Sequence, residues 1–422
     1  MGGVCLNTGT IPSKTLREAV LYLTGFQQRG FYGESYALKK DITIQDLMIR
    51  CNKVIASELE VIQSQLNRNG VEVLRGRARF ASPNRLNVST SNEEDQIDFA
   101  EAVIATGSAP ATYGRIPIDG KFVIDSDGIF NLVNIPKSLT VVGAGVIGIE
   151  YACMFAALGS KVTLIDQRQN ILEFLDGEIL QSLLYHMRDE GANIHLGEEV
   201  TEISVTGGKV TAKTRSNKVI SSDCLLYTVG RQGNTEALNL EMAGLKADER
   251  GRLKVNRYFQ TEVPNIYAAG DVIGFPSLAA TSMEQGRLAA RNAFGLLSLP
   301  NSELLPYGIY TIPEISMIGK TEEDLTKASE RYVIGIARYR EIARGQIIGD
   351  RTGMLKLLVS ATDHKILGVH IIGEGATELI HIGQAYMTLG GKVEQMVDTV
   401  FNYPTLAECY KVAALDVANK LR

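Results

Sequence analysis

The first hundred residues carry hydrophobic positions with two periods, one typical of helices and one typical of strands. Helices are predicted over about 11–26 and 44–69, and short β-rich runs at 71–74 and 102–104 predict strands. Pro12 suits the first turn of the earlier helix, where its missing amide hydrogen is not needed. The residues expected to share the buried face of that helix are Leu16, Ala19, Val20 and Leu23.

The middle of the chain alternates strands with helices. A β-rich run at 138–142 leads through a glycine turn into a helix that ends near Leu158, and a strand at 161–165 follows. This order is a βαβ unit, which predicts a parallel sheet covered by helices. A helix over about 177–190 and strands that end at 225–229 continue the pattern.

The last third mixes strands with helices after a stretch rich in Pro, Ser and Asn. That stretch, 298–306, predicts a linker, and a helix predicted from about Ser282 precedes it. No internal repeat occurs at a fixed short period. The strands predicted beyond the linker are 333–337, 354–359 and 366–372.

Length and composition fit a globular protein of two to four domains. The chain has 422 residues, too many for one ordinary core, and 45% of them are hydrophobic. The net charge is −5 and no Lys/Arg block occurs, which argues against nucleic-acid binding. Five scattered cysteines without a CxxC pair argue against a secreted disulfide framework and against a zinc site. We therefore expect no bound metal.

One apolar stretch could be mistaken for a membrane span. Residues 139–159 carry a single charge, Glu150, but their glycine spacing is better explained by a buried strand, turn and helix. No apolar run after Met1 resembles a signal peptide. We expect a cytoplasmic protein that does not associate with membranes.

The glycine turn of the βαβ unit has the spacing of a dinucleotide-binding site. Gly143, Gly145 and Gly148 form a GxGxxG sequence after a predicted strand, and Asp166 ends the next strand. Such glycines let the backbone approach a pyrophosphate, and the aspartate would accept hydrogen bonds from the adenine ribose. The alternative is a glycine-rich turn that binds no ligand.

Arg168 complicates the choice of coenzyme. A carboxylate at Asp166 alone favours NAD, because it repels the 2′-phosphate of NADP, whereas Arg168 could pair with that phosphate. One residue of each kind is compatible with the use of both coenzymes. The alternative is that Arg168 is an ordinary solvated surface charge.

The N-terminal segment resembles the redox-active segment of the flavoprotein disulfide reductases. It runs from Gly2 to Lys14 and contains Cys5, but Thr10 stands where that family has its second cysteine. A hydroxyl cannot form a disulfide, so dithiol chemistry is removed. This combination is similar to one branch of the family, the soluble pyridine nucleotide transhydrogenases. Cys5 could then be a small, buried hydrophobic residue without chemistry.

Three further short motifs extend the resemblance. In the family, an ATG turn ends the first nucleotide-binding domain, a GR turn closes the NAD domain, and the aspartate of a GD turn contacts FAD. A segment over 310–314 resembles the opening of the family's dimerisation domain. The matching residues are Thr106, Gly107, Gly230, Arg231, Gly270 and Asp271.

The resemblance also implies a charged pair beside the flavin. The lysine at position 14 would reach the flavin N5 region, and Glu150 on the coenzyme helix would pair with it. A buried lysine needs an anionic partner, and a cation near N5 stabilises reduced flavin. The alternative is that Lys14 and Glu150 are independent residues. With Cys5 and Thr10, they are the candidate catalytic residues.

Near the C-terminus the family carries a histidine that serves as acid and base for thiols. Here Tyr403 takes that position before Pro404, although Glu408 matches the family's supporting glutamate. A phenol with a pKa of about 10 is a poor base at neutral pH. The loss of the second thiol and of the base disfavours disulfide reduction and leaves hydride transfer between nicotinamide and flavin.

The implied fold is α/β, with two Rossmann-like nucleotide-binding domains, for FAD and NAD(P), and a C-terminal α+β dimerisation domain. The family begins with a further βαβ unit for the ADP half of FAD, which does not precede the redox segment here. We therefore expect either a shortened product or weak FAD binding. The expected parts are FAD-binding 1–115, NAD(P)-binding 116–238, FAD-binding 239–300 and dimerisation 301–422.

The implied function is FAD-dependent hydride transfer between NADPH and NAD in a homodimer. NADPH would reduce the flavin, NADP would leave, and NAD would take the hydride at the same site. One alternative is an NAD(P)H oxidase or diaphorase that reduces oxygen or a quinone. Another is a remnant that binds NAD, lacks flavin and has no activity.

Overall fold

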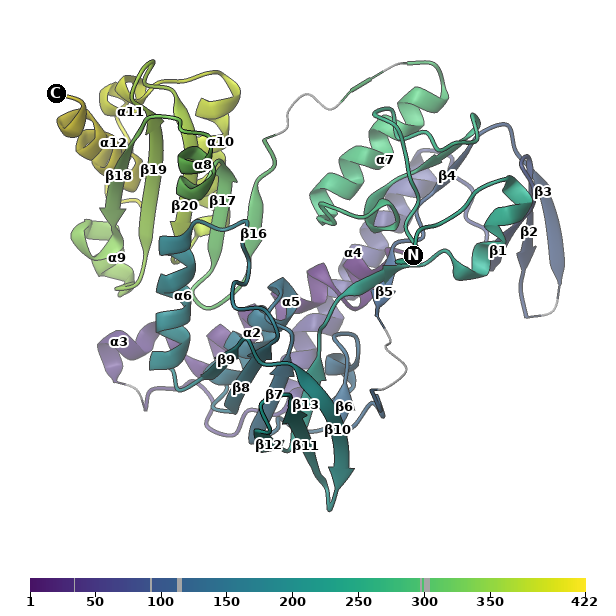
Figure 1. The fold of residues 1–422 in the computed structure, drawn as a ribbon, viewed down its shortest axis with the longest axis horizontal. Coiled ribbons are helices and arrows are strands. Elements are labelled where there is room, and N and C mark those ends of the chain that lie inside the picture. Colours follow the sequence, from purple (N-terminus) through teal and green to yellow (C-terminus); the bar gives the residue numbers. More distant parts are fainter. Residues whose placement is uncertain (34, 92, 112–115, 297, 300–303) are drawn as a thin grey trace. The chain divides into compact units, whose positions relative to one another are not determined.

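The computed structural model describes residues 1–422 except 34, 92, 112–115, 297 and 300–303 (Figure 1). The predicted linker and two of the predicted domain boundaries, after 115 and after 300, fall on or next to residues outside this description. The described chain forms two compact units. The first comprises Met1–Thr15, Ile49–Tyr113 and Gly230–Glu303, and the second comprises Leu16–Met48, Gly114–Val229 and Leu304–Arg422.

The first unit is built from short strands and a few helices. Strands β1, β2 and β3 form an antiparallel sheet, β4 pairs in parallel with β15, and β5 pairs with β14. Its core includes Phe80, Ile104 and Ile266. The elements are α1 (Gly3–Asn7), the start of α2 (Thr10–Thr24), most of α4 (Ile44–Arg68), β1 (Arg77–Ser82), β2 (Arg85–Ser89), β3 (Glu94–Asp98), β4 (Ala102–Ile104), β5 (Ser108–Pro110), β14 (Arg231–Gly233), β15 (Ile266–Ala268) and α7 (Ala279–Ala293).

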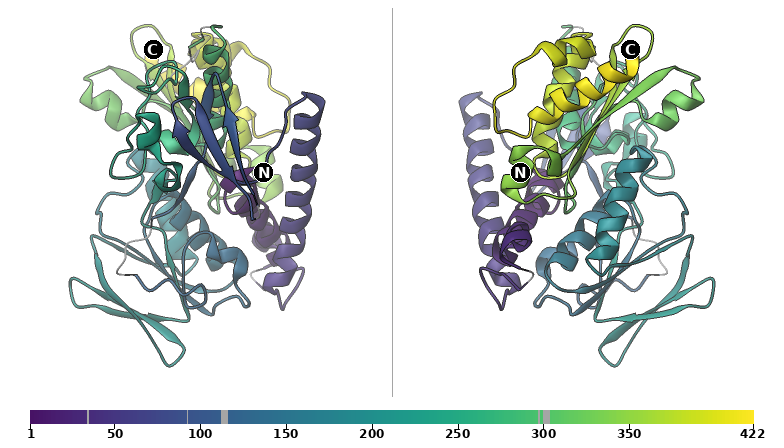
Figure 2. Two further views of the ribbon diagram at one scale, coloured as in Figure 1. Left: turned by 90° about the vertical axis from the view of Figure 1, so that its right-hand side faces the viewer. Right: turned by 90° about the vertical axis from the view of Figure 1, so that its left-hand side faces the viewer.

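The second unit contains a five-stranded parallel sheet in the order β6-β13-β7-β8-β9. Helix α5 packs on β7 and β8 and buries most of its side chains, so the predicted βαβ unit is confirmed. A hairpin sheet, β10-β11-β12, extends beyond it (Figure 2). The elements are α3 (Arg29–Tyr32), β6 (Val123–Ile124), β7 (Ser138–Val142), α5 (Val146–Ala157), β8 (Lys161–Asp166), α6 (Gly177–Asp189), β9 (Asn193–Leu196), β10 (Val200–Thr206), β11 (Lys209–Thr214), β12 (Val219–Ser222) and β13 (Cys224–Tyr227).

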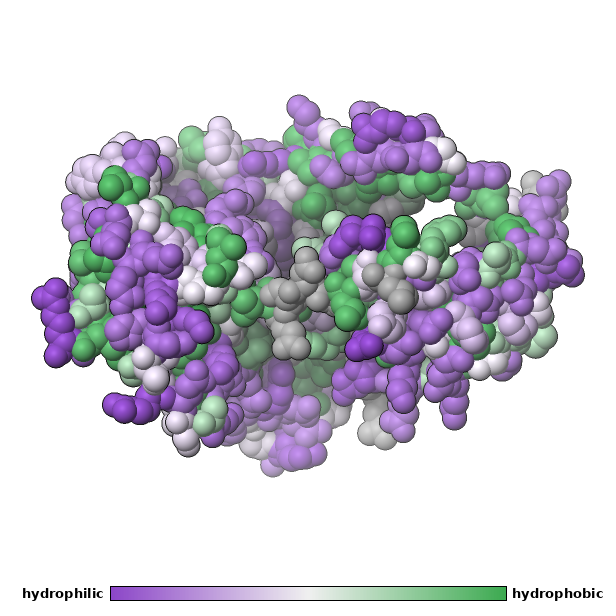
Figure 3. Space-filling model, turned by 90° about the horizontal axis from the view of Figure 1, so that it is seen from above, coloured by the Kyte–Doolittle hydropathy of each residue, from purple (hydrophilic) through white to green (hydrophobic). Residues whose placement is uncertain are grey.

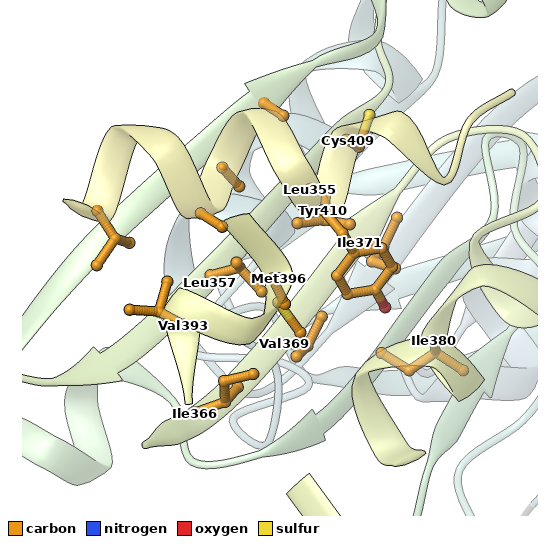
Figure 4. Close-up of a cluster of buried hydrophobic side chains, with 14 of the residues drawn as sticks. Leu355, Leu357, Ile366, Val369, Ile371, Ile380, Val393, Met396, Cys409 and Tyr410 are labelled. Carbon is orange, nitrogen blue, oxygen red and sulfur yellow. The ribbon is translucent and has the colours of Figure 1, made fainter. Parts of the chain in front are cut away.

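The C-terminal part of the second unit is an antiparallel sheet in the order β16-β17-β20-β19-β18. Helices α10, α11 and α12 cover one of its faces, and their apolar side chains meet those of β19 and β20 in a buried cluster (Figure 4). The elements are β16 (Tyr307–Ile309), β17 (Ile315–Gly319), α8 (Glu322–Lys327), β18 (Tyr332–Arg338), α9 (Ala343–Ile348), β19 (Met354–Ser360), β20 (Ile366–Ile372), α10 (Ala376–Thr388), α11 (Val393–Asp398) and α12 (Glu408–Leu421).

Alternation along β19 explains which side chains face these helices. Leu355 and Leu357 point into the helix-covered core, whereas Lys356 lies between them on the opposite face. Helix α6 packs against β20 on that opposite face. Lys356 is fully buried there and bonds Asp176, the N-cap residue of α6, at 2.8 Å. The buried charge pair therefore joins the parallel-sheet part of this unit to its antiparallel-sheet part.

Two sequence predictions need correction. Residues 71–74 form no strand, because no neighbouring described strand offers the backbone partners that a strand requires, and Val73 and Leu74 are exposed. The helix predicted from Ser282 begins at Ala279. The short helix α1 was not predicted, because its five residues are too few to show a helical period.

Hydrophilic side chains predominate on the face drawn in Figure 3, with hydrophobic ones gathered in small patches between them. In the described part of the chain, no helix is both long and apolar enough to cross a membrane. The apolar stretch at 139–159 forms β7, the glycine turn and α5, as its glycine spacing predicts.

Candidate coenzyme and flavin sites

The glycine turn of the second unit lies between β7 and α5. Gly143 has φ 106°, and a side chain there would bring a Cβ within 2.6 Å of the Thr228 carbonyl oxygen. A Cβ at Gly148 would clash with the Gly143 carbonyl oxygen, whereas a Cβ at Gly145 would meet no atom within 4 Å. Gly143 and Gly148 are therefore required by the fold, and Gly145 leaves the backbone open to a ligand.

The turn presents the N-terminus of α5. Gly145 is the N-cap residue and, having no side chain, offers the first-turn amides no side-chain acceptor. These amides and the helix dipole give the turn a positive end that suits a pyrophosphate. The geometry of the turn thus fits the phosphate part of a dinucleotide.

Asp166 ends β8 beside this turn and is almost fully buried. Its Oδ2 accepts the Ala144 amide at 2.6 Å and the Arg168 Nη2 at 2.7 Å. Its Oδ1 accepts the Arg168 backbone amide at 2.8 Å and the Arg168 Nε at 2.9 Å. The predicted ribose acceptor is therefore held by four donors within the protein.

These contacts set the charges of the pair. Burial opposes ionisation of Asp166, but the hydrogen bonds from Arg168 and from the Ala144 amide hold the pKa of the carboxyl below its usual value. The hydrogen bond from Arg168 to Asp166 in turn raises the pKa of Arg168. Both groups are charged at neutral pH and neutralise one another.

Glu150 lies inside α5 and is only 3% exposed. Its Oε1 accepts the Tyr310 amide at 2.8 Å, so it binds the segment that opens the C-terminal part of the same unit. Lys14 belongs to the first unit, near the start of α2. The predicted pairing of Glu150 with Lys14 stays a prediction.

The ATG, GR and GD turns of the sequence analysis all lie in the first unit. Gly107 and Gly230 have φ 68° and 124°, and a Cβ at either would meet no atom within 4 Å. Asn234 donates its side-chain amide to the Thr106 carbonyl at 3.1 Å and its backbone amide to the Gly107 carbonyl at 3.0 Å. The ATG and GR turns are therefore joined, and both border open space.

A hydroxyl that the sequence did not single out connects these turns to the third motif. Ser108 Oγ donates to Asp271 Oδ2 at 2.7 Å and accepts from Arg231 Nε at 2.8 Å, and Arg231 Nη2 donates to the Ser108 carbonyl at 2.7 Å. Ser108 is buried. Its position directly after the ATG motif was the signal that could have found it. The donors, the carboxylate and the open glycine turns fit a flavin nucleotide.

The redox-like segment forms α1 and the start of α2. Cys5 lies in α1 as a free, partly buried thiol, and Thr10 is the first residue of α2. In the C-terminal part, Tyr403 is 68% exposed and Glu408 begins α12. Cys5 and Thr10 thus lie on two consecutive helices, the short α1 and the start of the longer α2, and Tyr403 belongs to the other unit.

One group of acidic residues has the spacing of a metal site. Ligand atoms of Asp176, Glu178 and Glu322 lie within 4.8 Å of one another. The Lys356 ammonium bonds all three, at 2.8 Å from Asp176 and 3.2 Å from Glu178. The lysine supplies the positive charge that a metal ion would otherwise bring.

Known families match this chain along most of its length. A family model described as pyridine nucleotide-disulphide oxidoreductase matches residues 1–286. A second model, described as the dimerisation domain of the same family, matches residues 305–414. The second match covers the antiparallel sheet and its helices, so the predicted fold class is confirmed.

Curated relatives match the whole chain. It is 54% identical over 424 residues to a soluble pyridine nucleotide transhydrogenase of Mycobacterium tuberculosis, and 44% identical over 426 residues to that of Colwellia psychrerythraea. Each alignment covers 100% of this chain and 91% of the relative. The resemblance predicted from the motifs is confirmed.

Solved structures share the fold. LpdA from Mycobacterium tuberculosis superposes with a TM-score of 0.90 at 24% identity, and the HOCl-induced flavoprotein disulfide reductase RclA from Escherichia coli with 0.85 at 27%. Each match covers 98% of this chain and 91% of the solved one. With the family matches and the glycine turns above, this places the chain in the pyridine nucleotide-disulphide oxidoreductase family, whose members bind FAD and pyridine nucleotides.

Proposed function

We propose that this chain is a transhydrogenase that moves a hydride between NADPH and NAD with the help of bound FAD. The observation that carries the proposal is Thr10, which stands where a disulfide reductase needs its second cysteine. Nicotinamide–flavin hydride transfer needs neither a second thiol nor a thiol base. The full-length similarity to chains named soluble pyridine nucleotide transhydrogenase supports the same function.

In this proposal, the flavin binds to the parts 1–115 and 239–300 together with the GR turn, which lies at the end of the part 116–238 and belongs to the first unit. The ATG, GR and GD turns would hold it, with the Asp271 carboxylate oriented toward its ribityl and pyrophosphate region and Arg231 holding that turn through Ser108. Bound FAD supplies the group that accepts a hydride from one nucleotide and gives it to the other. The residues at these turns are Thr106, Gly107, Gly230, Arg231, Gly270 and Asp271.

The pyridine nucleotide belongs to the part 116–238. Gly143, Gly145 and Gly148 would let its pyrophosphate approach the N-terminus of α5. Asp166 and Arg168 would face its adenine ribose, because they stand at the end of β8 beside the turn.

The N-terminal residues are assigned supporting roles. The Lys14 ammonium would stabilise the negative charge that reduction brings to the flavin, with Glu150 as its expected counter-ion. Cys5 and Thr10 would belong to the same segment as Lys14 but would take no part in oxidation or reduction. A lone thiol cannot form the internal disulfide through which a disulfide reductase cycles.

The C-terminal part, 301–422, would join two copies into a homodimer. The match to a dimerisation-domain model supports this assembly. The word soluble in the relatives' names supports a cytoplasmic place of action.

The test is an anaerobic titration of the purified chain with NADPH, followed by NAD, while the visible spectrum is recorded. A transhydrogenase loses its flavin absorbance with NADPH and regains it on addition of NAD. The amount of NADH that appears equals the amount of flavin that is reoxidised. Dihydrolipoamide or glutathione disulfide turnover at a comparable rate would contradict the proposal.

The same experiment separates the alternatives. An oxidase or diaphorase would reoxidise only with oxygen or a quinone, and NAD would leave the reduced spectrum unchanged. A chain without flavin absorbance that does not take up added FAD would be a coenzyme-binding protein without this activity.

A further inference from the structure

One peptide group of the coenzyme turn, between Gly143 and Ala144, is held by the protein at both of its polar ends. Its carbonyl oxygen accepts a hydrogen bond from the Thr228 hydroxyl at 3.0 Å. Its amide donates to Asp166 Oδ2 at 2.6 Å. Among the described residues, no backbone amide donates to this carbonyl, so the hydroxyl is its partner. The orientation of the peptide therefore depends on two side chains, one at the end of β8 and one directly after β13.

Thr228 is itself fixed against the parallel sheet. Its amide donates to the Val142 carbonyl at 2.8 Å and so extends the pairing of β13 with β7 by one residue. Its hydroxyl lies 3.1 Å from the Val142 carbonyl and 3.0 Å from the Gly143 carbonyl. A hydroxyl has one hydrogen and donates it to one acceptor at a time. Because the Val142 carbonyl already has the Thr228 amide, the Gly143 carbonyl is the acceptor that needs the hydroxyl.

The two glycines that the fold requires lie against this hydroxyl. A Cβ at Gly143 would lie 3.0 Å from Thr228 Oγ1, and a Cβ at Gly148 would lie 2.7 Å from it. The hydroxyl thus occupies space that the missing side chains leave. Gly143 has φ 106°, and the conformational freedom of glycine means that the backbone alone does not fix the peptide that follows it. The hydrogen bond from Thr228 supplies that constraint.

The peptide groups that come next are those that a phosphate can reach. In the described part of the chain, the amides of Gly145 and Val146 donate to no protein acceptor. These amides follow the Gly143–Ala144 peptide directly along the chain, so its orientation sets theirs. Hydrogen bonds weaken steeply when donor and acceptor are misaligned. A shift of the held peptide would therefore weaken the binding of a pyrophosphate at the N-terminus of α5.

We propose that Thr228 is a positioning residue of the coenzyme site. Its hydroxyl, through the Gly143 carbonyl, holds the glycine turn in the conformation that receives the pyrophosphate of NAD or NADP. The proposal rests on the proposed function, which assigns this turn to the pyridine nucleotide. Because the two coenzymes carry the same pyrophosphate, Thr228 should contribute equally to the binding of both.

A series of substitutions separates the hydroxyl of Thr228 from the shape of its side chain. Thr228→Val keeps the branched shape and removes the donor, so the dissociation constants of NAD⁺ and NADP⁺ should both rise by about three- to tenfold, as expected for one lost hydrogen bond. Thr228→Ser keeps the donor and should stay within about twofold of the unmodified chain. Thr228→Cys has only a weak donor and should lie between these two variants.

The measurement is isothermal titration calorimetry of the full chain with NAD⁺ and with NADP⁺. Thr140→Val is the matched control, because Thr140 is buried on β7 of the same sheet and no described residue bonds its hydroxyl. It should leave both dissociation constants unchanged. Far-UV circular dichroism shows whether each variant is folded. If Thr228→Val does not fold, the comparison of Thr228→Cys with Thr228→Ser decides, since these two differ only in the γ atom.

Several results would overturn the proposal. Unchanged dissociation constants in Thr228→Val, or equal ones in Thr228→Cys and Thr228→Ser, would mean that the hydroxyl does not act on the turn. A loss in Thr228→Ser as large as that in Thr228→Val would mean that the shape of the side chain matters instead. A loss for one coenzyme only would place the effect away from the pyrophosphate. An unmodified chain that binds neither coenzyme would overturn the proposed function together with this inference, so the two failures are distinguishable.

Discussion

At the residue scale, Ser108 orders three turns that are far apart in sequence. Its hydroxyl lies between Arg231, which donates to it, and Asp271, which accepts from it. The guanidinium polarises the hydroxyl, so the hydrogen bond to the Asp271 carboxylate is strengthened and one orientation of that carboxylate is favoured. In the proposed function, Asp271 is the flavin contact, so Ser108 is a positioning residue.

Ser108→Ala should therefore weaken FAD binding by about tenfold, which corresponds to about 1.4 kcal/mol for one lost hydrogen bond to a charged group. The matched control is Thr235→Val, which removes another buried hydroxyl of the same unit, one that donates only to the Gly251 carbonyl. FAD fluorescence during titration of flavin-depleted protein measures the affinity. Equal losses in the two variants would mean that Ser108 acts on the fold alone.

At the element scale, the glycines of the β7–turn–α5 unit have two different roles, one in the fold and one in ligand binding. Gly148 packs against the Gly143 carbonyl within the turn, so the helix can start only if position 148 lacks a side chain. Gly145 has an extended backbone with φ −77° and open space around it. Any residue can adopt that conformation, so its glycine is explained by the close approach of a ligand.

The two glycines should thus respond differently to alanine. Gly148→Ala should lower the free energy of unfolding by about 1–3 kcal/mol, because the added methyl group forces the turn and α5 apart, and coenzyme binding should be lost with it. Gly145→Ala should keep the stability and lose coenzyme affinity only. Urea unfolding and calorimetry with NAD⁺ give the two quantities, and a destabilised Gly145→Ala would contradict this division.

At the scale of the second unit, Lys356 links the sheet that carries the coenzyme turn to the antiparallel sheet. Both Lys356 and Asp176 are fully buried, and the lysine also bonds Glu178 and Glu322. Asp176 caps α6 through the Glu178 amide at 3.1 Å. The charges belong to α6, α8 and β19, so the cluster forms only when these elements have met.

Lys356→Met should lower the free energy of unfolding by about 3–5 kcal/mol, because it leaves the Asp176 charge buried without its partner. Adding Asp176→Asn to this variant should recover part of the loss, since no buried charge remains. Urea unfolding of the two variants and the unmodified chain measures this. A double variant no more stable than the single one would show that the unpaired charge is not the cause.

The effect should depend on pH with a defined sign. Burial opposes ionisation of Asp176, but the electrostatic interaction with His370, the hydrogen bond and charge of Lys356 and the hydrogen bond from the Glu322 amide together hold the pKa of this carboxyl below its usual value. The contribution of Asp176 to stability is therefore present above about pH 4 and is lost as the pH falls further. Burial likewise opposes the charge of Lys356, yet its hydrogen bonds with Asp176 and Glu322 raise its pKa, so its contribution is lost only when the pH rises beyond about 10.5. The difference between Lys356→Met and the unmodified chain should be largest between these limits.

Local sequence patterns determined much of this protein. The glycine turn at Gly143, the βαβ unit around it and the helical periods of α2 and α4 were all predictable, because each depends on residues within a few turns of one another. The replacement of the second cysteine by Thr10 was equally visible in the sequence, since recognising it needs only a comparison of residue types. These features indicate the family and the proposed reaction.

Only the tertiary structure decided the rest. Residues 71–74 have the composition of a strand but form none, because a strand takes its hydrogen bonds from a neighbour that local sequence does not specify. Ser108 meets Arg231 and Asp271 across 123 and 163 residues, and Lys356 meets Asp176 across 180. Asp166 had the pattern of a ribose acceptor, but its bonds to Arg168 and to the Ala144 amide became visible only in the folded chain. Polar groups that leave water must find partners, and which partners are within reach is settled by packing.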